Sequence, residues 1–159
     1  MEMESKNYLR TVVSDDVDLI FNWSNDKAVR MQSFSSQPIK WEEHALWFSN
    51  ILKENNILFY ILTSGGHDVG QVRLKLLSSV AQISYSIAEN YRNKGFGKLI
   101  LQLIEEKLFD MYGMKYILEG EVKQSNIVSN KLFLQLGYNK YRETEDYVVY
   151  RKNLRKNNI

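Results

Sequence analysis

Residues 91–98, Tyr-Arg-Asn-Lys-Gly-Phe-Gly-Lys, form a basic turn that contains two glycines. An alternating, strand-like run at 82–87 precedes the turn, and a run with helical periodicity at 97–112 follows it. Glycines let a backbone approach a ligand closely, and the free N–H groups at a helix start, with the helix dipole behind them, favour phosphate. The turn therefore demands a strand-turn-helix unit and predicts an anion site at the start of the helix.

The remaining patterns predict a sheet with helices packed on it. We expect strands at 7–13, 58–62, 69–76, 81–88, 115–122 and 147–152, and helices at 14–25, 42–53, 97–112 and 126–136. A Gly-Gly pair at 65–66 joins two strands as a hairpin, whereas 26–38 is expected to be irregular. The apolar face expected for the helix at 42–53 is Ala45, Leu46, Phe48 and Leu52. The predicted class is α+β, with a mixed, largely antiparallel central sheet flanked by helices in three α/β/α layers.

Composition narrows the possible functions. The 159 residues fit one domain over 1–159, and the absence of Cys with only two His leaves little for metal ligation, so we expect no metal. A formal net charge of +2 is too small to indicate broad nucleic-acid binding. No apolar stretch approaches the ~20 residues of a membrane span, and the polar start lacks a secretion-signal layout. We therefore expect a soluble, cytoplasmic protein.

Two motifs carry a family resemblance. Arg92-Asn93-Lys94-Gly95-Phe96-Gly97 fits the pattern Arg-x-x-Gly-x-Gly. The second motif runs from Val122 through Asn126, Ser129 and Leu132-Phe133 to Leu136-Gly137-Tyr138. Both resemble signatures of the GCN5-related N-acetyltransferase (GNAT) superfamily, and the order of elements agrees across nearly the whole chain. The resemblance implies the GNAT fold and transfer of acetyl from acetyl-coenzyme A to an amine.

The resemblance also implies which residues hold acetyl-coenzyme A. Backbone amides in the turn would bind the pyrophosphate, with charge added by Arg92 and Lys94. Strand residues 85–87 would pair with the pantetheine arm, because family members splay this strand from the next. Asn126 and Ser129 would touch the arm near the thiol, although a helix cap and a small packing residue are their ordinary roles. The implied cofactor-binding set is Tyr85, Ser86, Ile87, Arg92, Asn93, Lys94, Gly95, Phe96, Gly97, Lys98, Asn126 and Ser129.

Acetyl transfer needs a group that takes a proton from the attacking amine. Glu121 is the candidate base, since bacterial N-terminal acetylating relatives carry a Glu immediately before the corresponding Val, and Gly120 beside it permits close backbone approach. Glu119 is the second choice, and a solvated carboxylate on an exposed strand is the alternative reading of either residue. Phe133 stands where many relatives place a general-acid tyrosine, so the acid is unassigned.

The N-terminal half resembles acetyltransferases that act on nucleotide-linked amino sugars, notably those of pseudaminic acid biosynthesis. The likeness includes Arg30, the Glu43-His44 pair, Trp47-Phe48 and Gly70-Gln71-Val72-Arg73. It implies that Arg30, His44 and Trp47 bind the acceptor, Arg30 through the diphosphate and the rings by stacking on a base. A polar helix face and a core tryptophan are the alternative.

The expected function is acetyl-coenzyme A-dependent N-acetylation of a primary amine on a nucleotide-linked amino sugar, by direct transfer in a ternary complex without a covalent acyl-enzyme. The expected small-molecule partner is a UDP-amino sugar. The alternatives are acetylation of a peptide or protein N-terminus, which Glu121-Val122 favours, and a non-catalytic coenzyme A-binding module, which Phe133 favours. We expect no nucleic-acid or membrane partner. An exposed final strand and the polar tail at 151–159 permit a homodimer as well as a monomer.

Overall fold

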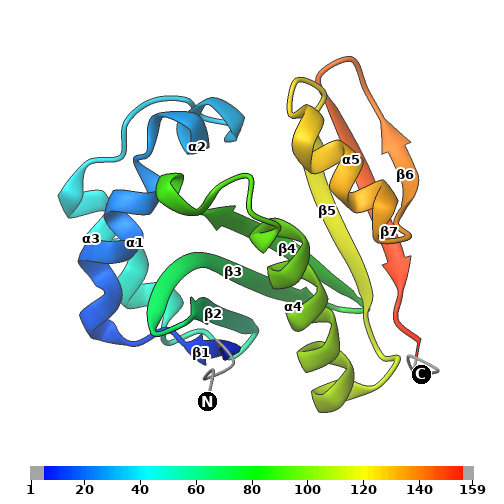
Figure 1. The fold of residues 1–159 in the computed structure, drawn as a ribbon, viewed down its shortest axis with the longest axis horizontal. Helices are drawn as coiled ribbons and strands as arrows, with labels where there is room; N and C mark the ends of the chain where they lie inside the picture. Colours follow the sequence, from blue (N-terminus) through cyan, green and yellow to red (C-terminus); the bar gives the residue numbers. More distant parts are fainter. Residues whose placement is uncertain (1–5, 156–159) are drawn as a thin grey trace, which may run out of the picture.

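Seven strands form one sheet in the computed structural model, which describes residues 6–155 (Figure 1). They lie in the order β1-β2-β3-β4-β5-β7-β6, and the β4–β5 pair is parallel while the other neighbours are antiparallel. The strands are β1 (Asn7–Thr11), β2 (Ile57–Ser64), β3 (His67–Leu77), β4 (Val80–Ile87), β5 (Ile117–Lys123), β6 (Asn139–Glu143) and β7 (Tyr147–Asn153). The predicted mixed, largely antiparallel sheet is confirmed.

Helices cover both faces of this sheet (Figure 1). They are α1 (Val17–Ser24), α2 (Lys27–Gln32), α3 (Trp41–Ile51), α4 (Phe96–Tyr112) and α5 (Ile127–Gln135), with 3-10 turns at Ser14–Asp16 and Glu89–Tyr91. The larger core lies between the sheet and α4 and α5, whereas a smaller core joins α1 and α3 to β2 and to Val12, which follows β1. Within residues 6–155, no helix has the length and apolar character needed to cross a membrane.

Strand β2 shows why both faces need a cover. Tyr60 and Leu62 belong to the core beneath α4, while Phe59 and Ile61 belong to the core beneath α1 and α3. Successive side chains of a strand point to opposite faces, so the continuous apolar run of β2 is buried on both sides. The antiparallel hairpin that follows turns at Gly65 and Gly66, both with positive φ, as the Gly-Gly pair predicted.

Three expectations about the elements were wrong. The segment expected to be irregular contains α2, whose first turn is capped by Asp26 through the Val29 amide. The strand β6 was missed because all five of its residues are exposed and show no apolar alternation. Its presence makes β7 an interior strand between β5 and β6, so the last predicted strand is not an exposed edge. Residues 156–159 of the predicted polar tail lie outside the described part.

The buried face of α3 also differs from the prediction. His44, Phe48 and Ile51 are its buried residues, whereas Leu46 is 65% exposed. The three buried positions follow the i, i+4, i+7 spacing of one helix face, so a histidine occupies a position where helical periodicity predicts an apolar side chain. Its Nε2 donates a hydrogen bond to the Val17 carbonyl at 2.9 Å, which satisfies the buried ring and ties α3 to the start of α1.

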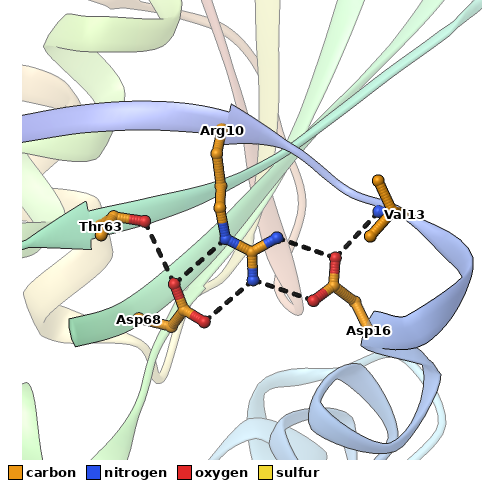
Figure 2. A network of polar contacts seen from close by, with 5 residues as sticks. All are labelled: Arg10, Val13, Asp16, Thr63 and Asp68. Atoms are coloured by element: carbon orange, nitrogen blue, oxygen red, sulfur yellow. Dashed lines mark hydrogen bonds and ion pairs between the residues drawn. The ribbon is translucent and has the colours of Figure 1, made fainter. Parts of the chain in front are cut away.

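A charged network ties the first strand to the hairpin and to the start of α1 (Figure 2). The Arg10 guanidinium donates two hydrogen bonds to the Asp16 carboxylate, each 2.9 Å long, and two more to Asp68. Asp16 also accepts the Val13 amide, and Asp68 accepts the Thr63 hydroxyl. This bidentate arrangement fixes the direction in which the chain leaves β1 toward the helices.

Candidate active site

Strands β4 and β5 separate partway along their length. They pair from Val80 with Ile117 to Ile83 with Gly120, and the pairing ends there. Beyond that point β4 continues to Ile87, held by β3 on one side, with its other edge unpaired by any strand. A cleft of about 870 Å³ lies at this divergence, lined by the last part of β4, the basic turn, the middle of β5, and residues of α2 and α5.

The basic turn forms one end of the cleft and presents backbone donors. Asn93 and Gly95 both have positive φ, and Gly95 is the N-cap of α4. The first hydrogen bond into the helix runs from the Leu99 amide to the Gly95 carbonyl, so the amides of Phe96, Gly97 and Lys98 have no acceptor within α4. An anion placed at this helix start meets three free N–H groups and the positive end of a 17-residue helix.

Arg92 lines the cleft but its charge is already paired. Its guanidinium donates to the Asp26 carboxylate at 2.7 Å and to the Ile87 carbonyl at 3.0 Å. Burial tends to raise the pKa of Asp26, but the hydrogen bonds from Arg92 and the Val29 amide lower it below its ordinary value. Arg92 therefore joins the basic turn to α2, and the expectation that it adds free positive charge beside the pyrophosphate needs this correction.

Residues of α5 line the opposite side of the cleft. The Asn126 side chain caps α5 by accepting the Ser129 amide at 3.2 Å, and the buried Ser129 hydroxyl is hydrogen-bonded to the Tyr85 hydroxyl of β4. Both residues thus have the ordinary structural roles considered for them, while also lining the cleft. The Tyr85–Ser129 contact bridges the two elements that flank the divergence, and burial raises the pKa of the Tyr85 phenol.

Phe133 fills the space behind the cleft and explains Gly120. A side chain at Gly120 would place its Cβ 2.5 Å from the Phe133 Cζ. The ring is 1% exposed and stacks on Tyr150 at an interplanar angle of 8°. The close backbone approach expected at Gly120 is therefore made by a core ring, and the glycine leaves room for Phe133.

Of the two candidate carboxylates, Glu121 is the one available to a substrate. It is exposed, lines the cleft, and makes no side-chain hydrogen bond or ion pair to residues 6–155. Glu119, the second choice, accepts a hydrogen bond from Arg151 at 2.8 Å and another from Gln82 at 3.3 Å. The single residue between them puts both on one face of β5, but only Glu121 lies at the divergence.

Three tyrosines near the cleft, Tyr85, Tyr91 and Tyr138, differ in whether their hydroxyls are available to a substrate. The Tyr138 hydroxyl donates to Glu105 at 2.8 Å, and burial together with that carboxylate raises its pKa far above the ordinary value. Tyr138 does not line the cleft, whereas Tyr85 and Tyr91 do. Phe133 itself carries no titratable group, so Tyr85 and Tyr91 are the phenols that line the cleft.

The structure does not bring Arg30 and His44 into this cleft. Arg30 donates to the carbonyls of Ser24, Ser35 and Gln37 and to the Ser33 hydroxyl, so it holds the segment after α2 in shape. His44 is 2% exposed and is surrounded by the rings of Phe21, Trp41, Trp47 and Phe48. Burial lowers its pKa, which keeps the ring neutral in this apolar setting. Trp47 is 37% exposed, but it does not line the cleft either.

The sheet, the divergence of two parallel strands and the anion-binding turn are the features expected of a coenzyme A-dependent acetyltransferase, and the family comparison agrees. The model of the acetyltransferase (GNAT) domain matches residues 7–139, so the chain belongs to the GNAT family. The family and the fold predicted from the two motifs are thereby confirmed.

The chain is also similar to particular proteins of known sequence or structure. A protein of Methanocaldococcus jannaschii is 28% identical over 158 residues, a match that covers 95% of this chain and 32% of that protein. The chain therefore spans about a third of the length of the curated relative it matches. The crystal structure of a domain from Methanocaldococcus jannaschii is similar with a TM-score of 0.82 at 24% identity, covering 95% of this chain and 100% of that one.

Two further solved structures share the fold at lower identity. Spermidine N-acetyltransferase from Vibrio cholerae, in complex with CoA and spermine, has a TM-score of 0.84 at 15% identity, covering 93% of this chain and 95% of that one. AAC(6')-Ib, in complex with paromomycin and acetyl-CoA, has a TM-score of 0.80 at 14% identity, covering 95% and 94%. At these identities the likeness establishes the common fold.

Proposed function

We propose that this chain transfers the acetyl group of acetyl-coenzyme A to a primary amine on a nucleotide-linked amino sugar, by direct attack in a ternary complex. The observation that carries the proposal is that the anion-binding turn and Glu121, at the divergence of β4 and β5, line the same cleft. Family membership and the CoA complexes of the structural neighbours support the donor.

The residues present fit coenzyme A. The amides of Phe96, Gly97 and Lys98 suit its pyrophosphate, and Lys94 and Lys98 add positive charge to the same turn. The free edge of β4 from Ser84 to Ile87 offers backbone groups to the amides of the pantetheine arm. Together these contacts run the donor from the turn toward Glu121.

Within that arrangement the acceptor amine attacks the thioester carbonyl as the C–S bond breaks. Glu121 receives the proton that the amine loses, directly or through a water. A thiol has a pKa near ~8.5, far below that of an alcohol, so the departing thiolate needs only modest assistance. The two protein groups that matter most are then the turn that fixes the donor and the one carboxylate that faces the acceptor.

Support for the sugar nucleotide as acceptor comes from the N-terminal half of the sequence and from Trp47, which stays partly exposed. The neighbours in the fold act on other amines, with spermine bound in one case and an aminoglycoside in another. The test is a screen for thiol release from acetyl-coenzyme A with UDP-amino sugars, spermine, an aminoglycoside and peptides with free N-termini. We expect release with an amino sugar nucleotide, and release with peptides or spermine alone would refute that acceptor class.

A further inference from the structure

The face of the sheet turned away from α4 carries three rows of polar side chains that cross β3, β4 and β5. In the first row Lys75, Gln82 and Glu119 lie side by side and continue to Arg151 on β7. In the third row Gln71 faces Ser86 and donates to its hydroxyl at 3.2 Å. Hydrogen bonds within the sheet face therefore use most of the polar groups of these two rows.

The middle row is different because its charged ends have no such partners. Arg73 pairs with Ser84 across β3 and β4, and Glu121 follows on β5 where the strands diverge. Among residues 6–155, the side chains of Arg73 and Glu121 make no hydrogen bond or ion pair. One strand spacing of about 4.8 Å separates β3 from β4, and Glu121 lies beyond the last β4–β5 pair, so the backbones of Arg73 and Glu121 are at least about 10 Å apart. A cation and an anion thus lie on the same face of the sheet, Glu121 in the lining of the cleft and the half-buried Arg73 outside that lining.

Arg73 is held in place by rings instead of by an acid. Its guanidinium carbon lies 5.0 Å from the centroid of the Trp47 ring and 5.6 Å from that of Phe59. Burial lowers the pKa of Arg73, while the negative charge of Glu54 raises it. Glu54 forms no ion pair with Arg73. Stacking of this kind orients the planar fork while leaving its N–H donors without acceptors. Such a guanidinium suits a bidentate anion.

We propose that Arg73, positioned by Trp47 and Phe59, binds an anionic group of the acceptor while the acceptor's amine lies near Glu121. Under the proposed function, on which this inference rests, the anion is the diphosphate and the exposed edge of Trp47 contacts the nucleoside. The role expected of Arg30 then passes to Arg73, because the donors of Arg30 are taken up by carbonyls.

A site with Arg73 in this role disfavours acceptors that are purely cationic. A polyamine that reaches Glu121 along the middle row meets the Arg73 charge on the way, and like charges repel unless solvent screens them. A molecule with an amine at one end and a phosphate at the other finds complementary charges at both. The specificity of the site therefore follows from having the Arg73 cation and the Glu121 anion on either side of Ser84 in one row.

The test is a titration with UDP followed by tryptophan fluorescence, with the turn first saturated with coenzyme A so that UDP cannot occupy it. Uridine serves as the probe without phosphate. We expect UDP to change the emission of the wild-type protein, Arg73→Gln to weaken UDP binding about tenfold or more, and Arg73→Lys to retain part of the affinity. Lys75→Gln, on the same face one row away, is the matched control and should bind UDP as the wild type does.

Coenzyme A affinity, measured by calorimetry, reports whether each variant is folded. UDP binding that is unaltered by Arg73→Gln, or equal binding of uridine and UDP, overturns the inference. If a UDP-amino sugar is acetylated and its KM is the same in wild type and Arg73→Gln, the inference fails while the proposed function stands. If UDP binding depends on Arg73 but only peptides or spermine are acetylated, the anion site stands and the proposed acceptor fails.

Discussion

Replacing Gly120 with Ala tests whether a core ring, and not a ligand, dictates this glycine. Alanine is the better residue in a strand by about 0.5–1 kcal/mol when nothing opposes its Cβ. Here the Cβ would lie 2.5 Å from Cζ and 2.8 Å from Cε1 of Phe133. Tyr150 stacks on that ring at a centroid distance of 5.4 Å, and Tyr138 meets its edge at 4.8 Å. The ring therefore has no free space into which it can move.

The clash should outweigh the strand preference. Overpacking in a closed core costs about 1–3 kcal/mol and the strand preference offsets about 0.5–1 kcal/mol of it, so the free energy of unfolding should fall by up to about 2.5 kcal/mol. For a domain of this size each kcal/mol corresponds to about 2–4 °C, which gives a decrease in Tm of up to about 10 °C. Urea denaturation, read by fluorescence and circular dichroism at constant m-value, measures the free energy directly.

A double-mutant cycle identifies the source of the loss. Phe133→Leu removes the ring atoms that meet the new Cβ, at the cost of a cavity. The pair Gly120→Ala with Phe133→Leu should then be less destabilising than the sum of the single changes, with a coupling of about 0.5–3 kcal/mol. A Gly120→Ala protein more stable than wild type, or strictly additive changes, would refute the packing argument.

Three further predictions follow from the same contacts. Glu121→Gln should lower turnover by about 10²–10⁴-fold with little change in coenzyme A affinity, while an unaltered rate in steady-state assays would remove Glu121 from the mechanism. Arg10→Met should cost about 1–3 kcal/mol near neutral pH in urea denaturation; a hydrogen bond from Arg10 lowers the pKa of Asp68, and at Asp16 burial raises the pKa while Arg10 and the Val13 amide together bring it below its ordinary value. Folding lowers the pKa of both carboxyls below 3.8, so this stabilisation is complete above pH 3.8 and disappears as the pH falls through the folded-state pKa values. The difference in unfolding free energy between Arg10→Met and wild type should therefore narrow at low pH. A difference that stays constant with pH contradicts this prediction. Asp26→Ala should lose both the α2 cap and the Arg92 pair, whereas Asp26→Asn keeps a capping oxygen and loses the charge, so its loss in thermal stability should be smaller; equal losses would show that the cap contributes little.

The parts of the fold that were predictable from sequence are those whose signal is local. The Gly-Gly hairpin and the basic turn need positive φ, which the sequence marks with glycine at 65, 66 and 95. The positions of β4 and α4 follow from alternation and from helical periodicity on either side of that turn. Asn126 as the cap of α5 was likewise open to prediction, because its side chain acts on an amide three residues away.

The candidate site was less predictable because its polar side chains form hydrogen bonds and ion pairs with residues far away in the sequence. Arg92 pairs with Asp26 across 66 residues, and nothing near either residue indicates that the charge of the turn is neutralised there. His44 carries no local sign that it fills a core position and donates to Val17. Arg73 carries no local sign of its neighbours, and only the register of β3, β4 and β5 shows that it lies beside Ser84 and in the row that leads to Glu121.

The alternation of β5 explains how one strand serves both substrates. Gly120 and Val122 point to the face covered by α4 and α5, where Gly120 accommodates Phe133. Glu121, between them, points to the opposite face, where it continues the row from Arg73. A shift of β5 by one residue would bury the carboxylate and expose the glycine, so the packing of Phe133 on Gly120 also fixes the face on which the proposed base lies. For this reason Gly120→Ala should disturb turnover more than its loss of stability alone accounts for, whereas an equally destabilising change such as Arg10→Met, distant from β5, should leave kcat unchanged in the folded fraction.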